Sequence, residues 1–188
     1  MKRLRNSSGF TDATVKKIVD WIAEDLGIAG FDVECRASKA GHIAGTAYHK
    51  GSGYHSSPRP FVVLRVGLEQ RFRFKRVPWD GRNASRWGTK EPDGSVTWTM
   101  SVPCGKMSNW PYLSEPYQYA QHKGRRVLLA TRTEGLVYIA AHELRHIWQA
   151  GRKSHRGYFH NSRGQFSEVD TEAYALHMLR AWRKKEAA

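Results

Sequence analysis

Three residues close together in the chain, His142, Glu143 and His146, have the types and spacing of a metal-dependent hydrolytic site. On a helix, residues four apart lie on one face, so both imidazole rings can bind the same ion. Neutral imidazole nitrogen is a good zinc ligand, and the glutamate beside the first ring can reach a zinc-bound water without binding the metal. Zinc lowers the pKa of that water, and Glu143 would take its proton as the water attacks a carbonyl group. The pattern predicts a Zn²⁺ cofactor with Glu143 as the general base.

A catalytic zinc ion usually has three protein ligands, so a third ligand is expected outside this motif. Downstream, Glu168 and Glu172 are four residues apart and share one face of a second predicted helix. One of them could bind the metal while the other hydrogen-bonds a ligating histidine and fixes the orientation of its ring. His155 and His160 are further imidazoles that could serve as ligands.

The pattern His142-Glu143-x-x-His146, followed after some twenty residues by Glu168-x-x-x-Glu172, resembles the gluzincin group of metallopeptidases. The resemblance implies that Glu168 is the third metal ligand and that Glu172 contacts the first histidine. The stretch that begins at Glu168 is also similar to that of small single-domain gluzincins, including SprT-like and phage- or plasmid-encoded relatives. The similarity extends over about residues 131–180.

The chain departs from this family pattern at one place. Those families usually have Ala and then Asp where this chain has Thr171 and Glu172, so Asp170 and Glu172 stay open as alternatives to Glu168. A metzincin would have a third histidine six residues after the second one of the motif. Arg152 stands at that position, which excludes the metzincin interpretation.

Related enzymes use a tyrosine or histidine beside the metal to stabilise the transition state. The candidates for this role are Tyr158, His160 and Tyr174. His155 or His160 could instead be a fourth protein ligand, which would close the metal site and make it a structural one.

Two helices must position these residues. A helix is predicted over about residues 132–150, because Thr131 and Glu134 have the spacing of a capping box. Its expected apolar side consists of Leu136, Ile139, Ala140, Ile147 and Ala150. A second helix, capped by Ser167, is predicted over about 168–184 and would carry the third ligand.

The preceding residues predict one helix and then several strands. Residues 11–26 have helical apolar spacing and end at a glycine. Strands are expected at 31–37, at 61–66 with 71–77 as its partner, at 96–102, and at 125–130 as an edge strand lining the cleft. Residues 40–60 are rich in Gly, Ser, His and Pro and are expected to form a loop or hairpin tip.

This order predicts a single α+β domain over residues 1–188. It would have an N-terminal helix, a small mostly antiparallel sheet, the metal-binding helix and a C-terminal helix that carries the third ligand. The resemblance implies a zincin-like form of this architecture.

The chain of 188 residues has a formal net charge of +14, which attracts polyanions at long range. Residues 71–76 alternate cations with aromatic rings, which is compatible with a nucleic-acid surface or with a strand that has one solvated basic face. Nucleic acid is therefore a candidate partner.

Other sequence features favour an intracellular, cytoplasmic protein without a membrane partner. No apolar run approaches the roughly 20 residues of a spanning helix, and the basic start is not followed by an apolar signal segment. Cys35 and Cys104 are too few for a disulfide framework and are expected to be reduced thiols.

The first functional hypothesis is a zinc-dependent metallopeptidase that hydrolyses peptide bonds in a peptide or protein substrate. The alternatives are a nucleic-acid-associated metalloprotein or DNA-linked protease, and a non-catalytic interaction protein stabilised by zinc. The oligomeric state is left open by the sequence.

Overall fold

The computed structural model describes residues 1–38, 43–48, 58–67, 129, 131–151 and 165–188. It also gives the backbone of five short strands between residues 75 and 128. The side chains of those five strands, and those of residues 165–167 and 169, lie outside the description.

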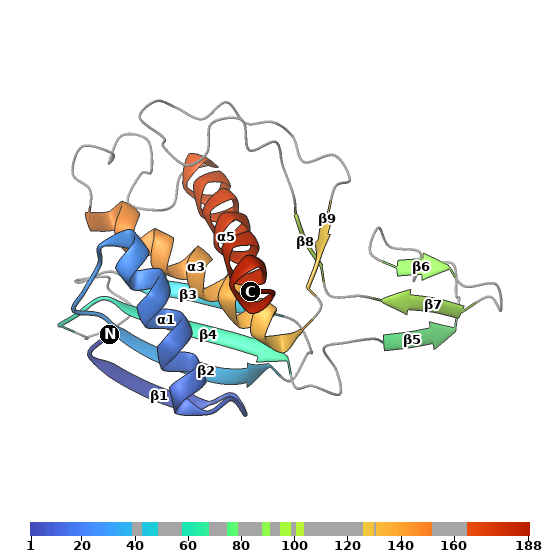
Figure 1. The fold of residues 1–188 in the computed structure, drawn as a ribbon, viewed down its shortest axis with the longest axis horizontal. Helices are drawn as coiled ribbons and strands as arrows, with labels where there is room; N and C mark the ends of the chain where they lie inside the picture. The colour runs from blue at the N-terminus through green and yellow to red at the C-terminus, as the bar shows by residue number, and fades with distance from the viewer. Residues whose placement is uncertain are drawn as a thin grey trace.

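A mixed four-stranded sheet forms the base of the fold (Figure 1). Its order is β1 (Arg3–Ser7), β2 (Asp32–Ser38), β4 (Phe61–Gly67) and β3 (Ala44–Tyr48). The first three strands run parallel and only β3 is antiparallel to its neighbour. The expectation of a mostly antiparallel sheet was therefore wrong for this sheet. Two pairings cause the difference. Strand β1, which the sequence analysis missed, is parallel to β2 because a helix connects them, and β2 is also parallel to β4.

Helix α1 (Asp12–Leu26) lies where the apolar spacing predicted a helix, and it connects β1 to β2. The side chain of Thr11 accepts a hydrogen bond from the backbone N–H of Thr14 and so caps the helix start. Gly27 ends the helix in the left-handed conformation at φ 62°, which glycine adopts without steric cost.

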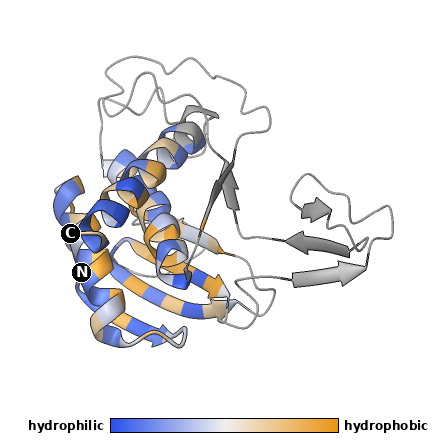
Figure 2. Ribbon diagram, turned by 45° about the vertical axis from the view of Figure 1, so that its right-hand side comes forward, coloured by the Kyte–Doolittle hydropathy of each residue, from blue (hydrophilic) through white to orange (hydrophobic). Residues whose placement is uncertain are grey.

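The hydrophobic core lies between one face of the sheet and the helices. Side chains alternate between the two faces of a strand, and one set is buried: Val33, Cys35, Val62, Leu64 and Val66. Helices α1 and α3 (Arg132–Gly151) cover this face, and α5 (Gln165–Glu186) packs on α3 (Figure 1). Apolar and polar residues alternate along β2, whereas β4 begins with four apolar residues (Figure 2). The α+β class is confirmed, with three helices in the described part of the chain.

The two closing helices have nearly the predicted bounds. Thr131 accepts the backbone N–H of Glu134 at 3.1 Å, which confirms the cap of α3. Helix α5 begins at Gln165, so Ser167 lies inside the helix and the predicted cap there was wrong. The expected apolar side of α3 is buried, except that Ala150 is only partly buried.

Strand β4 ends at Gly67 and helix α3 begins at Arg132, and these two residues lie close together. The guanidinium of Arg132 donates to the carbonyl oxygen of Gly67 at 2.6 Å and to that of Ser8 at 2.7 Å. It also lies 4.3 Å from the ring centre of Phe10. One side chain thus connects the ends of β1 and β4 to the start of α3.

The five short strands form two further sheets. Strands β5 (Lys75–Pro78), β7 (Ser95–Trp98) and β6 (Gly88–Lys90) pair antiparallel, as do β8 (Ser101–Pro103) and β9 (Arg126–Leu128). The expected pairing of 71–77 with 61–66 was wrong, because β5 pairs with β7. Residues 71–74 lie outside the described part.

Two findings bear on the expected environment of the protein. Within the described part of the chain, every helix is too short or too polar to cross a membrane. Cys35 is a free, buried thiol whose pKa is raised by burial, whereas Cys104 falls outside the described residues.

Candidate metal centre

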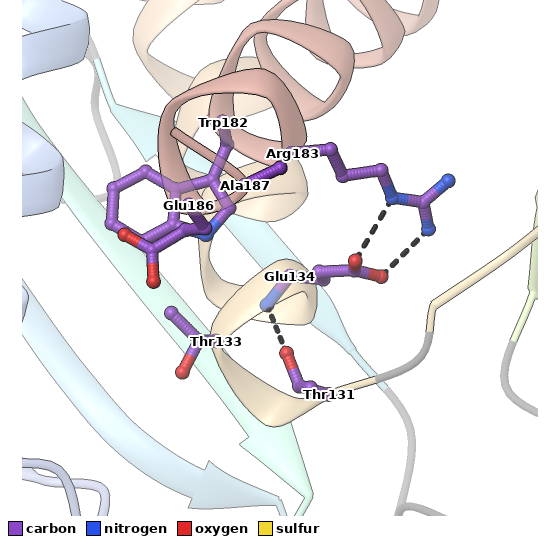
Figure 3. A pocket seen from close by; sticks show the side chains of 7 residues that line it. All are labelled: Thr131, Thr133, Glu134, Trp182, Arg183, Glu186 and Ala187. Atoms are coloured by element: carbon purple, nitrogen blue, oxygen red, sulfur yellow. Dashed lines mark hydrogen bonds and ion pairs between the residues drawn. The ribbon is translucent and has the colours of Figure 1, made fainter.

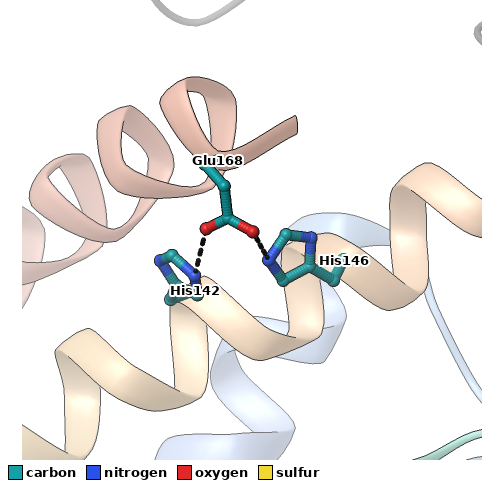
Figure 4. Close-up of side chains that lie close together, drawn as sticks. All are labelled: His142, His146 and Glu168. Carbon is teal, nitrogen blue, oxygen red and sulfur yellow. Dashed lines mark ion pairs between the residues drawn. The ribbon is translucent and has the colours of Figure 1, made fainter. Parts of the chain in front are cut away.

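The two histidines of α3 and one glutamate of α5 converge at one point (Figure 4). The four-residue helical spacing brings the ring centres of His142 and His146 to 5.0 Å from each other. Glu168, in the first turn of α5, points between the two rings. The predicted pair and the predicted third ligand therefore come together from two helices.

The distances in this cluster fit a single metal ion. The Nε2 atom of His142 lies 3.3 Å from Oε2 of Glu168, and the Nε2 atom of His146 lies 3.3 Å from Oε1. Two ligand atoms that are each about 2.0–2.1 Å from a tetrahedral zinc ion lie roughly 3.3 Å apart. The cluster of His142, His146 and Glu168 could thus hold a metal ion.

The electrostatics of the cluster favour a cation. Hydrogen bonds from His142 and then His146 hold the pKa of Glu168 far below its usual value, despite partial burial. Burial lowers the pKa of His146, but Glu168, Glu143 and Gln149 outweigh burial and raise it overall. An ionised carboxylate beside two imidazoles attracts positive charge to this point.

Glu143 lies beside the cluster and packs against strand β3. Its side chain is buried, and burial raises the pKa of its carboxyl group, although His142 and His146 oppose that shift. The backbone of Ala47 on β3 hydrogen-bonds this carboxylate. Gly45 leaves the space that Glu143 occupies: a Cβ atom at this position would come to 2.6 Å from Cδ of Glu143 and closer still to Cγ and Oε1.

Strand β3 is the edge strand beside the metal helix, which the sequence analysis had sought at residues 125–130. Of those residues, Arg126–Leu128 form β9, which pairs with β8. Strand β3 pairs with β4 on one side and has no other partner among the described strands. It was missed because it lies in the Gly-rich stretch 40–60, and the close approach of Glu143 is one reason for a glycine there.

No family model, no curated protein and no solved structure matches this chain. The assignment of the site therefore depends on its geometry.

Asp170, one of the alternative ligands, is placed away from the ion position. Its carboxylate accepts two hydrogen bonds from Arg145, at 2.7 and 3.0 Å, and one from the side chain of Gln149 at 2.8 Å. The Oε1 atom of Gln149 in turn lies 3.0 Å from Nδ1 of His146. Sequence reasoning did not identify Gln149 or Arg145 as parts of the site, because only the packing of α3 on α5 brings them to Asp170.

The remaining predicted site residues have different outcomes. Glu172 is half-buried one turn after Glu168, and its contact with the first histidine stays a prediction. The hydroxyl of Tyr174 donates to Asp25 on α1 at 2.7 Å, which is a contact outside the cluster, and its role at the metal stays a prediction. Tyr158 and His160, like His155, lie outside the described residues.

A separate hollow of about 370 Å³ lies where α3 begins and α5 ends (Figure 3). Arg183 and Glu134 in its wall form two hydrogen bonds with each other, at 2.9 and 2.7 Å. Its lining consists of Thr131, Thr133, Glu134, Trp182, Arg183, Glu186 and Ala187. None of the cluster residues is among them, so this hollow is distinct from the candidate metal centre.

Proposed function

We propose that this protein is a zinc-dependent metallopeptidase with a zincin-like fold of the gluzincin type. The observation that supports it most is the convergence of His142, His146 and Glu168, whose candidate ligand atoms all lie within 4.8 Å of one another. With three protein ligands, a zinc ion would keep a fourth position open for water or substrate, as catalytic zinc sites do.

A zinc ion bound here would supply Lewis acidity and lower the pKa of a water molecule at the open position. The residues of the chain perform the other steps. The carboxylate of Glu143 accepts the proton of the attacking water, and its raised pKa makes it a better proton acceptor than an exposed glutamate. It can then deliver that proton to the amine of the leaving group.

The position of β3 supports an extended peptide as substrate. This strand lies directly beside Glu143 and has a neighbour on one side only among the described strands. An extended peptide can add to such an edge through main-chain hydrogen bonds. The scissile carbonyl group would then lie near the cluster, whatever the side chains of the peptide.

Metal analysis of the purified protein tests the site directly. We expect about one zinc equivalent per chain, and we expect its loss in the His146→Ala and Glu168→Gln variants, because three ligands become two. Glu168→Gln is the cleaner change, since that side chain is 58% exposed and its replacement leaves the core intact.

The matched control is His177→Ala, which removes a half-buried histidine from the same helix α5 outside the cluster. It should keep its zinc. Wild-type protein that stays free of metal after exposure to zinc, or ligand variants that retain it, would contradict the proposed site.

A second candidate function, association with nucleic acid, is favoured by the outer face of the sheet. In the described part of the chain, the strand register places four arginines around Asp32 and Glu34 on the face away from the helices: Arg3, Arg5, Arg36 and Arg65. A fifth, Arg59, forms an ion pair with Asp32 at 3.2 Å. The pKa of Glu34 is lowered by its hydrogen bond with Arg36, with smaller contributions from Arg5 and Arg65. On the same face, the rings of Tyr48 and Phe61 stack at 5.9 Å.

Guanidinium groups bind phosphates well, and aromatic rings on an open sheet can stack with bases. We therefore propose single-stranded nucleic acid as the ligand of this arginine face. Replacing Arg3, Arg5 and Arg65 by Gln should weaken binding of a single-stranded oligonucleotide. It should also reduce the slope of log K against log salt by about 2, or roughly 0.7 per lost phosphate contact.

The control removes the same charge elsewhere, by replacing Lys17, Lys184 and Lys185, three exposed lysines of α1 and α5, with Gln. Its slope should stay near that of the wild type. Equal losses in the two variants would show that only net charge matters, and no binding by the wild type at low salt would exclude this function.

A further inference from the structure

Two arginine–carboxylate ion pairs connect helices α3 and α5, one near each end of their contact. Near the metal cluster, Arg145 of α3 pairs with Asp170 of α5 through two hydrogen bonds, at 2.7 and 3.0 Å. At the opposite end, Glu134 of α3 pairs with Arg183 of α5, also through two hydrogen bonds (Figure 3). The two pairs have similar geometry, so the differences between them are informative.

The pair near the metal cluster is the more deeply buried of the two. The side chains of Arg145 and Asp170 are 8% and 1% exposed, whereas those of Arg183 and Glu134 are 39% and 11% exposed. Moving two charges out of water is costly, and replacing a buried ion pair by uncharged side chains is often neutral or even stabilising. The proposed mechanism uses neither of the two buried charges. Stability is therefore a weak reason for this pair.

The surroundings of the buried pair fix its geometry. The guanidinium carbon of Arg145 lies 3.7 Å from the ring centre of Trp148 and 5.2 Å from that of Tyr174. Gln149 donates a further hydrogen bond to Asp170 at 2.8 Å. A guanidinium group and a carboxylate form two parallel hydrogen bonds only when their planes and positions match. The backbone of α5 at Asp170 is thus held at one position relative to α3.

Glu168, the third ligand of the proposed site, depends on that position. It precedes Asp170 by two residues in the first turn of α5, and its side chain is 58% exposed. An exposed side chain has little packing of its own to hold it in place. A slip of one residue would move α5 by about 1.5 Å and rotate its side chains by about 100°. Either change would carry the carboxylate of Glu168 away from the two histidines.

We propose that Arg145 and Asp170 are positioning residues, whose buried ion pair fixes the first turn of α5 on α3 and so holds Glu168 at the ion position. The consequence for metal binding rests on the proposed function. The position of this helical turn, in contrast, is a property of the metal-free protein. Asp170 thus contributes to the site without binding the ion.

The test variant combines Arg145→Met with Asp170→Asn. It removes both charges, so the net charge beside the ion position is unchanged, and the asparagine oxygen can still accept a hydrogen bond from Gln149. The matched control combines Arg183→Met with Glu134→Gln. It makes the same kinds of change in the same two helices, at the end of their contact that is far from the metal cluster.

The first measurement is NMR of the full-length, metal-free protein. The hydroxyl oxygen of Thr171, the residue after Asp170, lies 3.4 Å from Nε2 of His142, so nuclear Overhauser contacts between these two side chains report on the first turn of α5. The rings of Trp21 and Trp182, with centres 5.6 Å apart, report on its far end.

We expect the test variant to weaken the contact between Thr171 and His142 and to keep the contact between the two tryptophans. The control should keep the contact between Thr171 and His142. A test variant in which this contact has its wild-type strength would overturn the proposal, whether or not the protein binds zinc.

The second measurement compares zinc affinity, from competition with a chelator, with stability, from thermal unfolding. Changing a residue that supports a metal ligand usually lowers metal affinity about 10- to 100-fold, and we expect a loss in this range for the test variant. Its stability should change little, because no unpaired charge is left buried. The control should keep the wild-type affinity even where its unfolding temperature falls. Affinity that follows stability across both variants would overturn the positioning role.

Arg145→Lys is a milder variant that keeps the charge of the pair. A lysine ammonium group lacks the planar fork that binds a carboxylate through two parallel hydrogen bonds. We therefore expect a weaker contact between Thr171 and His142 and a lower zinc affinity than in the wild type. If the double variant does not fold, this variant decides, and wild-type values in both measurements would overturn the proposal.

Failure of the proposed function gives a different pattern. A wild-type protein that binds no zinc, but whose contact between Thr171 and His142 weakens in the test variant, would support the positioning role and remove the metal-dependent function. Zinc binding by the wild type, with an unchanged contact and unchanged affinity in the test variant, would do the reverse.

Discussion

Glu143→Gln is expected to lower peptide hydrolysis by a factor of about 10² to 10⁴ while leaving the zinc content unchanged. The substitution keeps the size of a side chain that is only 5% exposed, so the fold around it should persist. It removes the carboxylate that would accept the proton from water. Because Glu143 is not one of the three clustered ligands, the metal should remain bound.

The measurement combines elemental analysis with cleavage of a denatured protein or a mixed peptide library. The matched control is Glu24→Gln, the same chemical change at an exposed position of α1, which should retain full activity. Full hydrolysis by Glu143→Gln would refute the general-base mechanism. Zinc binding without hydrolysis in the wild type would instead favour the non-catalytic interaction protein.

Gly45→Ala should have the second-largest effect, although it changes a residue that is neither ligand nor base. The added methyl group would occupy the space of the Glu143 side chain. Strand β3 is held in register by β4, so the flexible glutamate is the partner expected to move. A displacement of about 1 Å at a reacting group can lower the rate by about 100-fold, and we expect a loss of that order with zinc retained.

A double-mutant comparison shows whether the effect acts through Glu143. Gly45→Ala should cost stability in the wild type, as overpacking does, but little in a Glu143→Ala background, where the colliding atoms are absent. Thr46→Ala changes the neighbouring residue, which points to the other face of β3, and should leave hydrolysis unchanged. Normal activity of Gly45→Ala would show that Glu143 is not positioned by this contact.

Features set by local spacing could be predicted from the sequence. The facing of His142 and His146 follows from helical periodicity, which also placed Glu168 and Glu172 on one face of a second helix. The choice of Glu168 between these two came from the resemblance to gluzincins. The cap at Thr131 and the glycine end of the first helix could likewise be predicted, since each depends on residues within one turn. These features can be predicted without knowing how the sheet is arranged.

Features set by contacts between distant segments could not be predicted. Strand β1 is short and basic, and only its pairing with β2 makes it a strand. The stretch that contains β3 has the composition of a loop, but the packing of α3 on it gives Gly45 a role beside Glu143. The parallel order of the sheet follows from pairings between strands that are distant in the sequence, and no local sequence pattern predicts them.

The environment of Asp170 is a second case, within the site, of contacts between distant segments that could not be predicted. The departure from the family pattern at Thr171 and Glu172 left Asp170 open as a candidate ligand, and the sequence offered no reason to join it to Arg145. The relative register of α3 and α5 decides between the two roles. Asp170 and Arg145 are 25 residues apart along the chain. The register of the two helices brings Oδ2 of Asp170 to 2.7 Å from Nε of Arg145.

The bridge made by Arg132 has a consequence for how this chain can vary in length. Because one guanidinium joins Ser8, Gly67 and the start of α3, the excursion from residue 68 to residue 131 begins and finishes at nearly the same spot. Closing a longer excursion adds only about 0.6 kcal/mol for each doubling of its length. Insertions or deletions between residues 68 and 131 can therefore accumulate during evolution, and a shorter segment can be engineered. Neither change needs to alter the positions of His142 and His146 relative to Glu168.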